Sequence, residues 1–101
     1  MIDDLTKEMF AENLNTKFKI QAEGADPIEI ELTELKVGVE TPTHQQFTLL
    51  FLGPQNIFLP QQIYQVEHDK LGDFELFLVP IAQRPEGFQY EAVFNRLSEE
   101  S

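Results

Sequence analysis

The segment Phe47–His68, FTLLFLGPQNIFLPQQIYQVEH, decides the fold. Its first six residues contain a single polar side chain, Thr48, so they do not alternate as a strand with one buried face would. Gly53–Pro54 ends this run, and a second run, Ile63–His68, alternates with a period of two. The segment therefore predicts two strands. The first is apolar on both faces, which raises the question of what covers its second face.

Two earlier runs predict a hairpin that folds at Glu23–Ala25. In one register, apolar residues share one face of the hairpin and opposite charges meet on the other face. The pairs in this register are Phe18–Ile30, Ile20–Ile28, Lys19–Glu29 and Lys17–Glu31. Because a single register satisfies both faces, we expect it to be the native one.

The later strands are marked by turn signals. The apolar positions change parity after the hairpin, which predicts a β-bulge near Thr33–Glu34. Asp69 and Gly72 fit the first and fourth positions of a type I turn. We expect Pro80 to end the strand that follows this turn, and a last strand to cover residues 88–95.

The N-terminus predicts one short helix. Thr6 can cap it, and Leu5 and Phe10 have the spacing of a hydrophobic staple. The expected organisation is one domain, 1–101, with the helix at about 6–14, a β region at 16–95 and a frayed tail at 96–101. The fold class is mostly β: a small antiparallel barrel or a strongly bent sheet of six to seven strands with one short N-terminal helix.

Apolar residues occupy both parities of the later strands. One set is expected to fill the interior: Phe47, Leu49, Phe51, Tyr64, Val66, Phe74, Leu76, Leu78, Phe88, Tyr90, Ala92 and Phe94. The other set is the candidate interface: Leu50, Leu52, Ile63, Phe77, Val79 and Val93. Three explanations compete for this second face. The helix and the Ile57–Phe58 segment cover it, it joins copies of the chain, or it binds a protein partner or an apolar ligand.

Composition excludes several classes of function. The net charge of −11 repels phosphate backbones and anionic membrane surfaces, so neither nucleic acid nor a membrane is expected as a partner. The absence of Cys removes disulfides, thiolate metal sites and cysteine nucleophiles. No signal peptide and no apolar run of about 20 residues is present, so we expect a cytoplasmic protein.

Catalytic residue patterns are lacking. The serines are Ser98 and Ser101 in the tail, so the usual nucleophilic triads have no nucleophile. His68 is expected to bond the turn that follows it, and His44 to lie in a solvated loop. No calcium-binding loop is present, and no catalytic residue, cofactor or metal ligand is predicted.

The carboxylates to test for acid-pair hydrolysis are Glu29, Glu31 and Glu75. Each also fits an outward position on an amphipathic strand, facing a lysine or water. An acid pair needs opposed environments to separate the two pKa values, and the pattern indicates no such cleft.

Several blocks together resemble a known family. These blocks are LTKEMF, FTLLFLGP, LPQQIYQVEH, LGDFELFLVPI and YEAVFN. Their order is similar to that in a bacterial family of small proteins catalogued as a domain of unknown function, over about residues 5–95. Gln62–Ile63 departs from the Gly and small polar residue expected there, while Glu67, His68 and Asn95 match as strand-end hydrogen bonders. The resemblance implies no catalytic residue. It implies that members of the family accompany phage-tail-like proteins in bacterial genomes.

The sequence therefore predicts a non-catalytic β domain that acts through contact with a protein partner or with copies of itself. The resemblance implies a structural or assembly component of a phage-tail-like particle. The alternative is a small barrel that binds an apolar ligand in its interior, where Tyr64 and Tyr90 offer hydroxyl groups.

Overall fold

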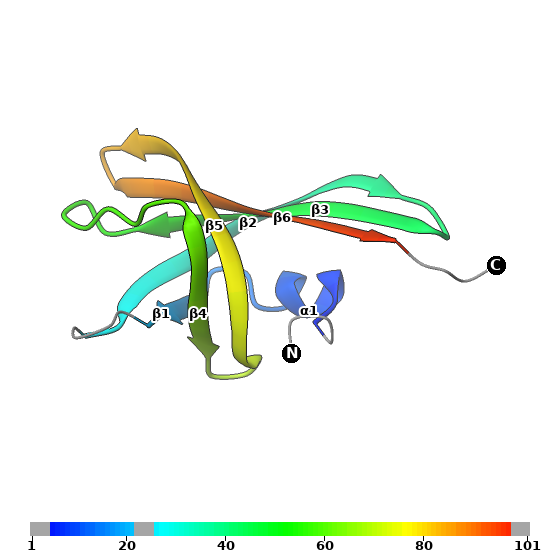
Figure 1. Ribbon diagram of the computed structural model, residues 1–101, viewed down its shortest axis with the longest axis horizontal. Coiled ribbons are helices and arrows are strands. Elements are labelled where there is room, and N and C mark those ends of the chain that lie inside the picture. Colours follow the sequence, from blue (N-terminus) through cyan, green and yellow to red (C-terminus); the bar gives the residue numbers. More distant parts are fainter. Residues whose placement is uncertain (1–4, 22–25, 98–101) are drawn as a thin grey trace.

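The computed structural model describes residues 5–21 and 26–97 of the 101-residue chain. The elements within these residues are α1 (Lys7–Ala11), β1 (Lys17–Ile20), β2 (Ile28–Glu40), β3 (His44–Gly53), β4 (Gln62–His68), β5 (Gly72–Arg84) and β6 (Gly87–Leu97). The strands form an antiparallel ring in the order β1-β2-β3-β6-β5-β4, which confirms the mostly-β class and the barrel (Figure 1). The predicted turn at Glu23–Ala25 and residues 98–101 of the predicted tail lie outside the described residues.

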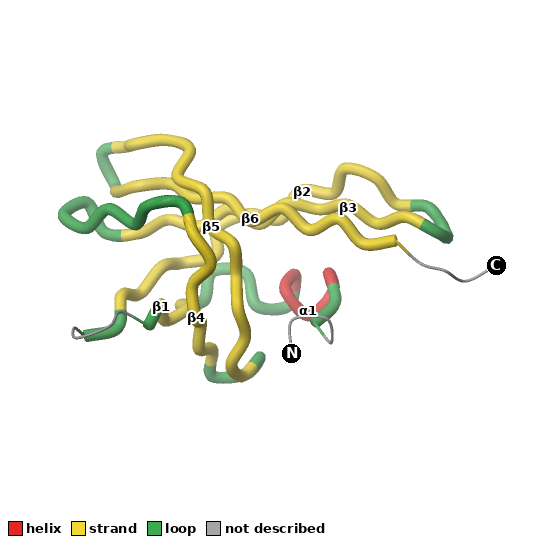
Figure 2. Tube along the Cα trace, viewed as in Figure 1, coloured by secondary structure: helices red, strands yellow, loops and turns green. Residues whose placement is uncertain are grey.

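The ring closes through a short pairing of β1 with β4, and its opposite side is extended. In the described chain, β1 and β4 pair at Lys19–Glu67 and Ile20–Val66. On the far side, β2, β3 and β6 continue past the ring as a three-stranded arm that ends beyond helix α1 (Figures 1 and 2). This arm makes the molecule elongated, with extents of 47 × 25 × 23 Å.

The predicted hairpin register is confirmed. β1 and β2 pair at Lys17–Glu31, Phe18–Ile30, Lys19–Glu29 and Ile20–Ile28. The predicted bulge is also confirmed, because the β2–β3 register shifts between Leu32 and Glu34. A second shift lies between Val37 and Val39, in the arm.

Helix α1 begins as predicted and ends early. The Thr6 hydroxyl accepts a hydrogen bond from the Met9 N–H at 3.1 Å, so Thr6 is the N-cap. The helix stops at Ala11, not at residue 14, because the Asn13 side chain donates to the Met9 carbonyl at 2.7 Å. Asn15 then adopts the left-handed conformation, with φ of 66°, and turns the chain into β1.

Two predicted strand boundaries are wrong. Pro80 does not end β5, which continues to Arg84. Pro80 pairs with Tyr90 next to a bulge between Pro80 and Ala82, and a bulge tolerates the missing N–H of proline. β6 likewise runs on to Leu97, because its last residues pair with the start of β3 and are not frayed.

The barrel interior is filled by the predicted set of side chains. All members of that set are buried except Phe88 and Phe94, which are half-buried. The helix adds Phe10, which is fully buried. Its ring centroid lies 6.3 Å from that of Phe47, 6.2 Å from Phe74 and 5.4 Å from Phe94. Helix α1 therefore closes the end of the interior where β5 and β6 separate (Figure 2).

Candidate functional site

The six candidate interface residues fall into three classes of exposure. Ile63 is 62%, Val93 52% and Phe77 49% exposed. Leu52 and Val79 are half-buried, while Leu50 is only 6% exposed. We call Ile63, Phe77, Val79 and Val93 the outer patch, because they lie on the outward face of β4, β5 and β6.

Leu50 does not belong to an accessible surface, which corrects that prediction. The bulge in β2 places an extra residue, Thr33, beside the Glu34–Leu50 pair. The Thr33 hydroxyl donates to the Leu50 carbonyl at 3.1 Å. On its other side Leu50 pairs with Glu91 of β6, so Leu50 sits in the middle of three paired strands.

Neither the helix nor the Ile57–Phe58 segment covers the outer patch. The helix contributes Phe10 to the interior. The ring centroid of Phe58 lies 5.3 Å from that of Phe88, which pairs with Gly53 near the start of β6. The first explanation for the second face is therefore wrong. The two explanations that remain are contact with a copy of the chain and contact with another molecule.

The outer patch is built around one cross-strand pair. Ile63 of β4 lies directly opposite Phe77 of β5, and Val79 follows on the same face. The β5–β6 ladder reaches only to Val79–Glu91, although its register would set Phe77 opposite Val93. Val93 therefore lies on the far side of the point where the two strands separate. The patch therefore lies on both sides of the point where β5 and β6 separate.

The two candidate pocket tyrosines use their hydroxyl groups on the chain itself. Tyr90 accepts a hydrogen bond from the Leu59 N–H at 2.9 Å, and Tyr64 donates to the Pro60 carbonyl at 2.5 Å. Burial raises the pKa of both phenols. Both side chains anchor the connection between β3 and β4 over the end of the barrel. Their hydroxyl groups bond this connection, whereas the sequence predicted that they face a ligand in the barrel interior.

His68 has the structural role that the sequence predicted. Its Nδ1 accepts from the Lys70 N–H at 3.0 Å and from the Leu71 N–H at 3.1 Å, which holds the β4–β5 turn. The proton of the neutral ring is therefore on Nε2, 2.9 Å from the Thr16 hydroxyl, which in turn donates to the Asn13 carbonyl at 2.7 Å. Burial lowers the pKa of His68, in keeping with this neutral form.

The other strand-end residues also make hydrogen bonds. His44 was expected in a solvated loop, but it begins β3, and its Nε2 lies 2.6 Å from the Asn95 side-chain oxygen. This bond joins β3 to β6 within the arm. Glu67 accepts from the Gln21 side chain at 3.4 Å, beside the seam of the ring. The family-pattern residues therefore act as structural hydrogen bonders.

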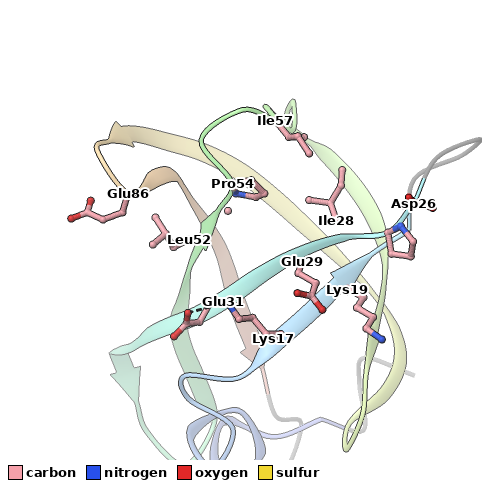
Figure 3. A pocket seen from close by; sticks show the side chains of 12 residues that line it. Lys17, Lys19, Asp26, Ile28, Glu29, Glu31, Leu52, Pro54, Ile57 and Glu86 are labelled. Atoms are coloured by element: carbon pink, nitrogen blue, oxygen red, sulfur yellow. Dashed lines mark hydrogen bonds and ion pairs between the residues drawn. The ribbon is translucent and has the colours of Figure 1, made fainter.

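A groove of ≈ 960 Å³ opens beside β2 and brings together two of the three carboxylates singled out in the sequence. The groove is lined by apolar and by charged residues (Figure 3). The apolar ones are Ile28, Leu52, Pro54 and Ile57, and the charged ones are Lys17, Lys19, Asp26, Glu29, Glu31 and Glu86. Glu75 lies elsewhere on β5 and accepts from Gln65 at 2.7 Å.

Acid-pair chemistry lacks the environment it needs in this groove. Glu29 is exposed, and the Glu31 carboxylate lies 3.4 Å from the Lys17 ammonium. A glycosidase general acid instead requires an apolar surrounding that keeps it protonated. Among residues 5–21 and 26–97, no group of three or more His, Asp or Glu side chains is placed to hold a metal ion.

The sequence contained a signal for this groove that the period-two pattern hides. β3 pairs with β2 at Glu31–Leu52, and the next residues in that register would set Pro54 opposite Glu29. Proline has no N–H to continue the ladder, so β3 departs from β2 at this point. Pro54 in this register therefore marks the opening, which hydrophobic alternation alone does not reveal.

A family model described as a domain of unknown function, DUF6916, matches residues 5–94. The chain belongs to the DUF6916 family. This confirms the resemblance to a domain of unknown function, and the match includes every residue of the outer patch and of the groove. No curated protein and no solved structure matches the chain. Within the described residues, no helix is long and apolar enough to span a bilayer.

Proposed function

We propose that this DUF6916 chain is a non-catalytic contact domain whose outer patch binds the same patch on a second copy. Most soluble homo-oligomers close through such two-fold, self-complementary contacts. The observation that carries the proposal is the exposure of Ile63, Phe77 and Val93 on the wall of a barrel whose interior is already filled. The family resemblance adds the context, a structural or assembly component of a phage-tail-like particle built from repeated copies.

The area of the outer patch limits the contact that the patch can make by itself. Three side chains that are each about half exposed offer on the order of 300 Å², since a large aromatic side chain buries roughly 150–250 Å². This is at the lower end of the roughly 300–600 Å² of the largest patch on a typical monomer, and below the about 800 Å² per partner of a standard interface. The contact must therefore also cover neighbouring polar side chains. We expect a weak dimer that forms as concentration rises.

The neighbours of the patch permit a second copy. Gln65 follows Ile63 on the outward face of β4, and Thr48 pairs with Val93; both side chains are neutral, whereas the acidic Glu91 lies opposite Val79. The Glu75 carboxylate already accepts a hydrogen bond from Gln65. Like charges elsewhere on two acidic chains still repel each other, so added salt should strengthen self-association by screening them. Salt would instead weaken the binding of a basic partner.

Sedimentation equilibrium across a concentration series tests the proposal. Wild-type protein should show a monomer–dimer equilibrium, and Ile63→Asp and Phe77→Asp should each weaken it at least tenfold, because a carboxylate is buried at the contact. Val37→Asp is the matched control, since Val37 is 49% exposed, like Phe77, but lies in the arm.

Circular dichroism on the same samples reports whether each variant is folded. A wild-type chain that stays monomeric would reject the second copy and leave a different protein as the occupant. Unfolding of both patch variants would show that the face is core. An equal loss for Val37→Asp would show that the association does not depend on the outer patch.

A further inference from the structure

β2 has a half-paired segment beside the groove. Along Ile28–Glu31 it pairs with β1, and from Glu31 to Glu40 it pairs with β3. Residues Ile28–Ile30 therefore have a strand neighbour on one side and the groove on the other. An unpaired strand edge is a template for the addition of another extended chain.

The backbone of Glu29 points into this groove. The Leu32 N–H donates to the Thr16 carbonyl of the segment before β1 at 3.1 Å, so Leu32 directs its backbone groups toward β1. Backbone direction alternates along an antiparallel strand, so Ile30 and Ile28 also face β1 while Glu29 faces away from it. The Glu29 N–H and C=O are thus placed to bond an added strand.

The chain prevents its own β3 from using this edge. Gly53 lies so close to β2 that an added Cβ would be 3.2 Å from the Ile30 Cγ2. Pro54, which the β2–β3 register would set opposite Glu29, has no N–H to pair with it, so β3 leaves β2 before this position. Figure 3 shows Pro54 and Ile57 on one side of the groove and Ile28 on the other. The opening therefore has an apolar lining as well as a strand edge.

The charges around the groove specify the occupant. Four carboxylates, those of Asp26, Glu29, Glu31 and Glu86, face two ammonium groups, and Lys17 is already engaged by Glu31 at 3.4 Å. No ion pair joins the other three carboxylates to a cation within the described part of the chain. The net charge of −11 adds long-range attraction for a cationic partner.

We infer that the groove binds an extended peptide segment of a partner protein that alternates apolar and basic residues, and that the segment adds as a strand to β2 at Glu29. Its apolar side chains lie on Ile28 and Ile57, and its basic side chains lie beside Glu29 and Glu31, because successive side chains of a strand point to opposite faces. This site is separate from the outer patch and does not depend on self-association.

The test uses fluorescence anisotropy with a labelled, acetylated octapeptide of alternating valine and lysine. The wild-type chain should bind this peptide at least tenfold more tightly than the matching valine–glutamate peptide. Glu29→Lys should weaken binding at least tenfold. Glu75→Lys carries the same charge change on β5 outside the groove, and it should weaken binding no more than about threefold through the general field. Phe77→Asp should leave binding unchanged.

Strand addition requires backbone hydrogen bonds from the peptide, whereas simple charge attraction does not. A valine–lysine peptide N-methylated at alternate residues keeps its charge but loses backbone donors, and it should bind at least tenfold less tightly in one of the two methylation patterns. Equal loss in Glu29→Lys and Glu75→Lys would overturn the site. Full binding by both methylated peptides would overturn strand addition, and no binding of the unmodified peptide would overturn the inference as a whole.

Discussion

Two phenylalanines should differ sharply in what they contribute to stability. Phe10 is fully buried and contacts the rings of Phe47, Phe74 and Phe94, whereas Phe77 is 49% exposed opposite Ile63. Truncating a buried Phe to Ala costs about 3–5 kcal/mol in lost burial and residual cavity. Truncating Phe77 removes one cross-strand pair and part of a side chain, which costs about 1 kcal/mol or less.

Urea denaturation measures both costs in one experiment. With a urea m-value of about 1.5 kcal/mol/M, Phe10→Ala should lower the unfolding midpoint by about 2–3 M and Phe77→Ala by about 0.7 M or less. The samples should be dilute, so that dimer formation does not add to the apparent stability. Phe10→Leu is a milder variant for use if Phe10→Ala does not fold. Equal costs at the two positions would refute the claim that the helix closes the interior and leaves the outer face open.

Three further predictions concern the cap, the turns and pH. Thr6→Ala removes the helix N-cap and should cost about 1 kcal/mol in urea denaturation, and no change would show that α1 is held by Phe10 alone. Gly87→Ala should lower the melting temperature more than twice as much as Gly72→Ala, because a Cβ on Gly87 would lie 1.9 Å from the Gly53 carbonyl oxygen, whereas Gly72 has nothing within 4 Å. Burial lowers the pKa of His68 below 6.5, so the unfolded chain takes up a proton first. The stability that His68 contributes should be complete above about pH 6.5 and should fall as pH drops through the folded-state pKa. His68→Gln should flatten the slope of the unfolding free energy against pH between about pH 5 and 7. An unchanged slope would assign the pH dependence to other groups.

Local pairing was predictable because two independent patterns agree. The β1–β2 register follows from apolar residues such as Phe18 and Ile30 on one face and from Lys19 and Glu29 on the other. The bulge beside Thr33 follows from a change of parity, which a strand achieves only by inserting a residue. These features depend on neighbours in the sequence or on one short hairpin.

The boundaries that failed depend on contacts across the structure. The helix ends at Ala11 because Asn13 bonds the Met9 carbonyl, a choice that helix propensity does not encode. Pro80 stays within β5 because a bulge absorbs the missing N–H opposite Tyr90. Hydrophobic period gives no information on either event.

The residues of the outer face were predictable from the sequence, but their exposure was not. Alternation identified Ile63, Phe77 and Leu50 as one face, but exposure depends on strand order and on where adjacent strands separate. Leu50 is enclosed by β2 and β6, whereas Phe77 lies where β5 leaves β6. The same is true of the helix, because its apolar stripe does not say which side of the sheet it covers.

The most direct test of the central claim is the native mass of the purified wild-type chain, measured by light scattering over a wide concentration range. An outer patch that joins two copies predicts a mass that rises from 11.7 kDa at dilution toward twice that value. A further rise with added salt would agree with contact between two acidic chains. A mass of 11.7 kDa at every concentration and salt level would contradict self-association through Ile63 and Phe77.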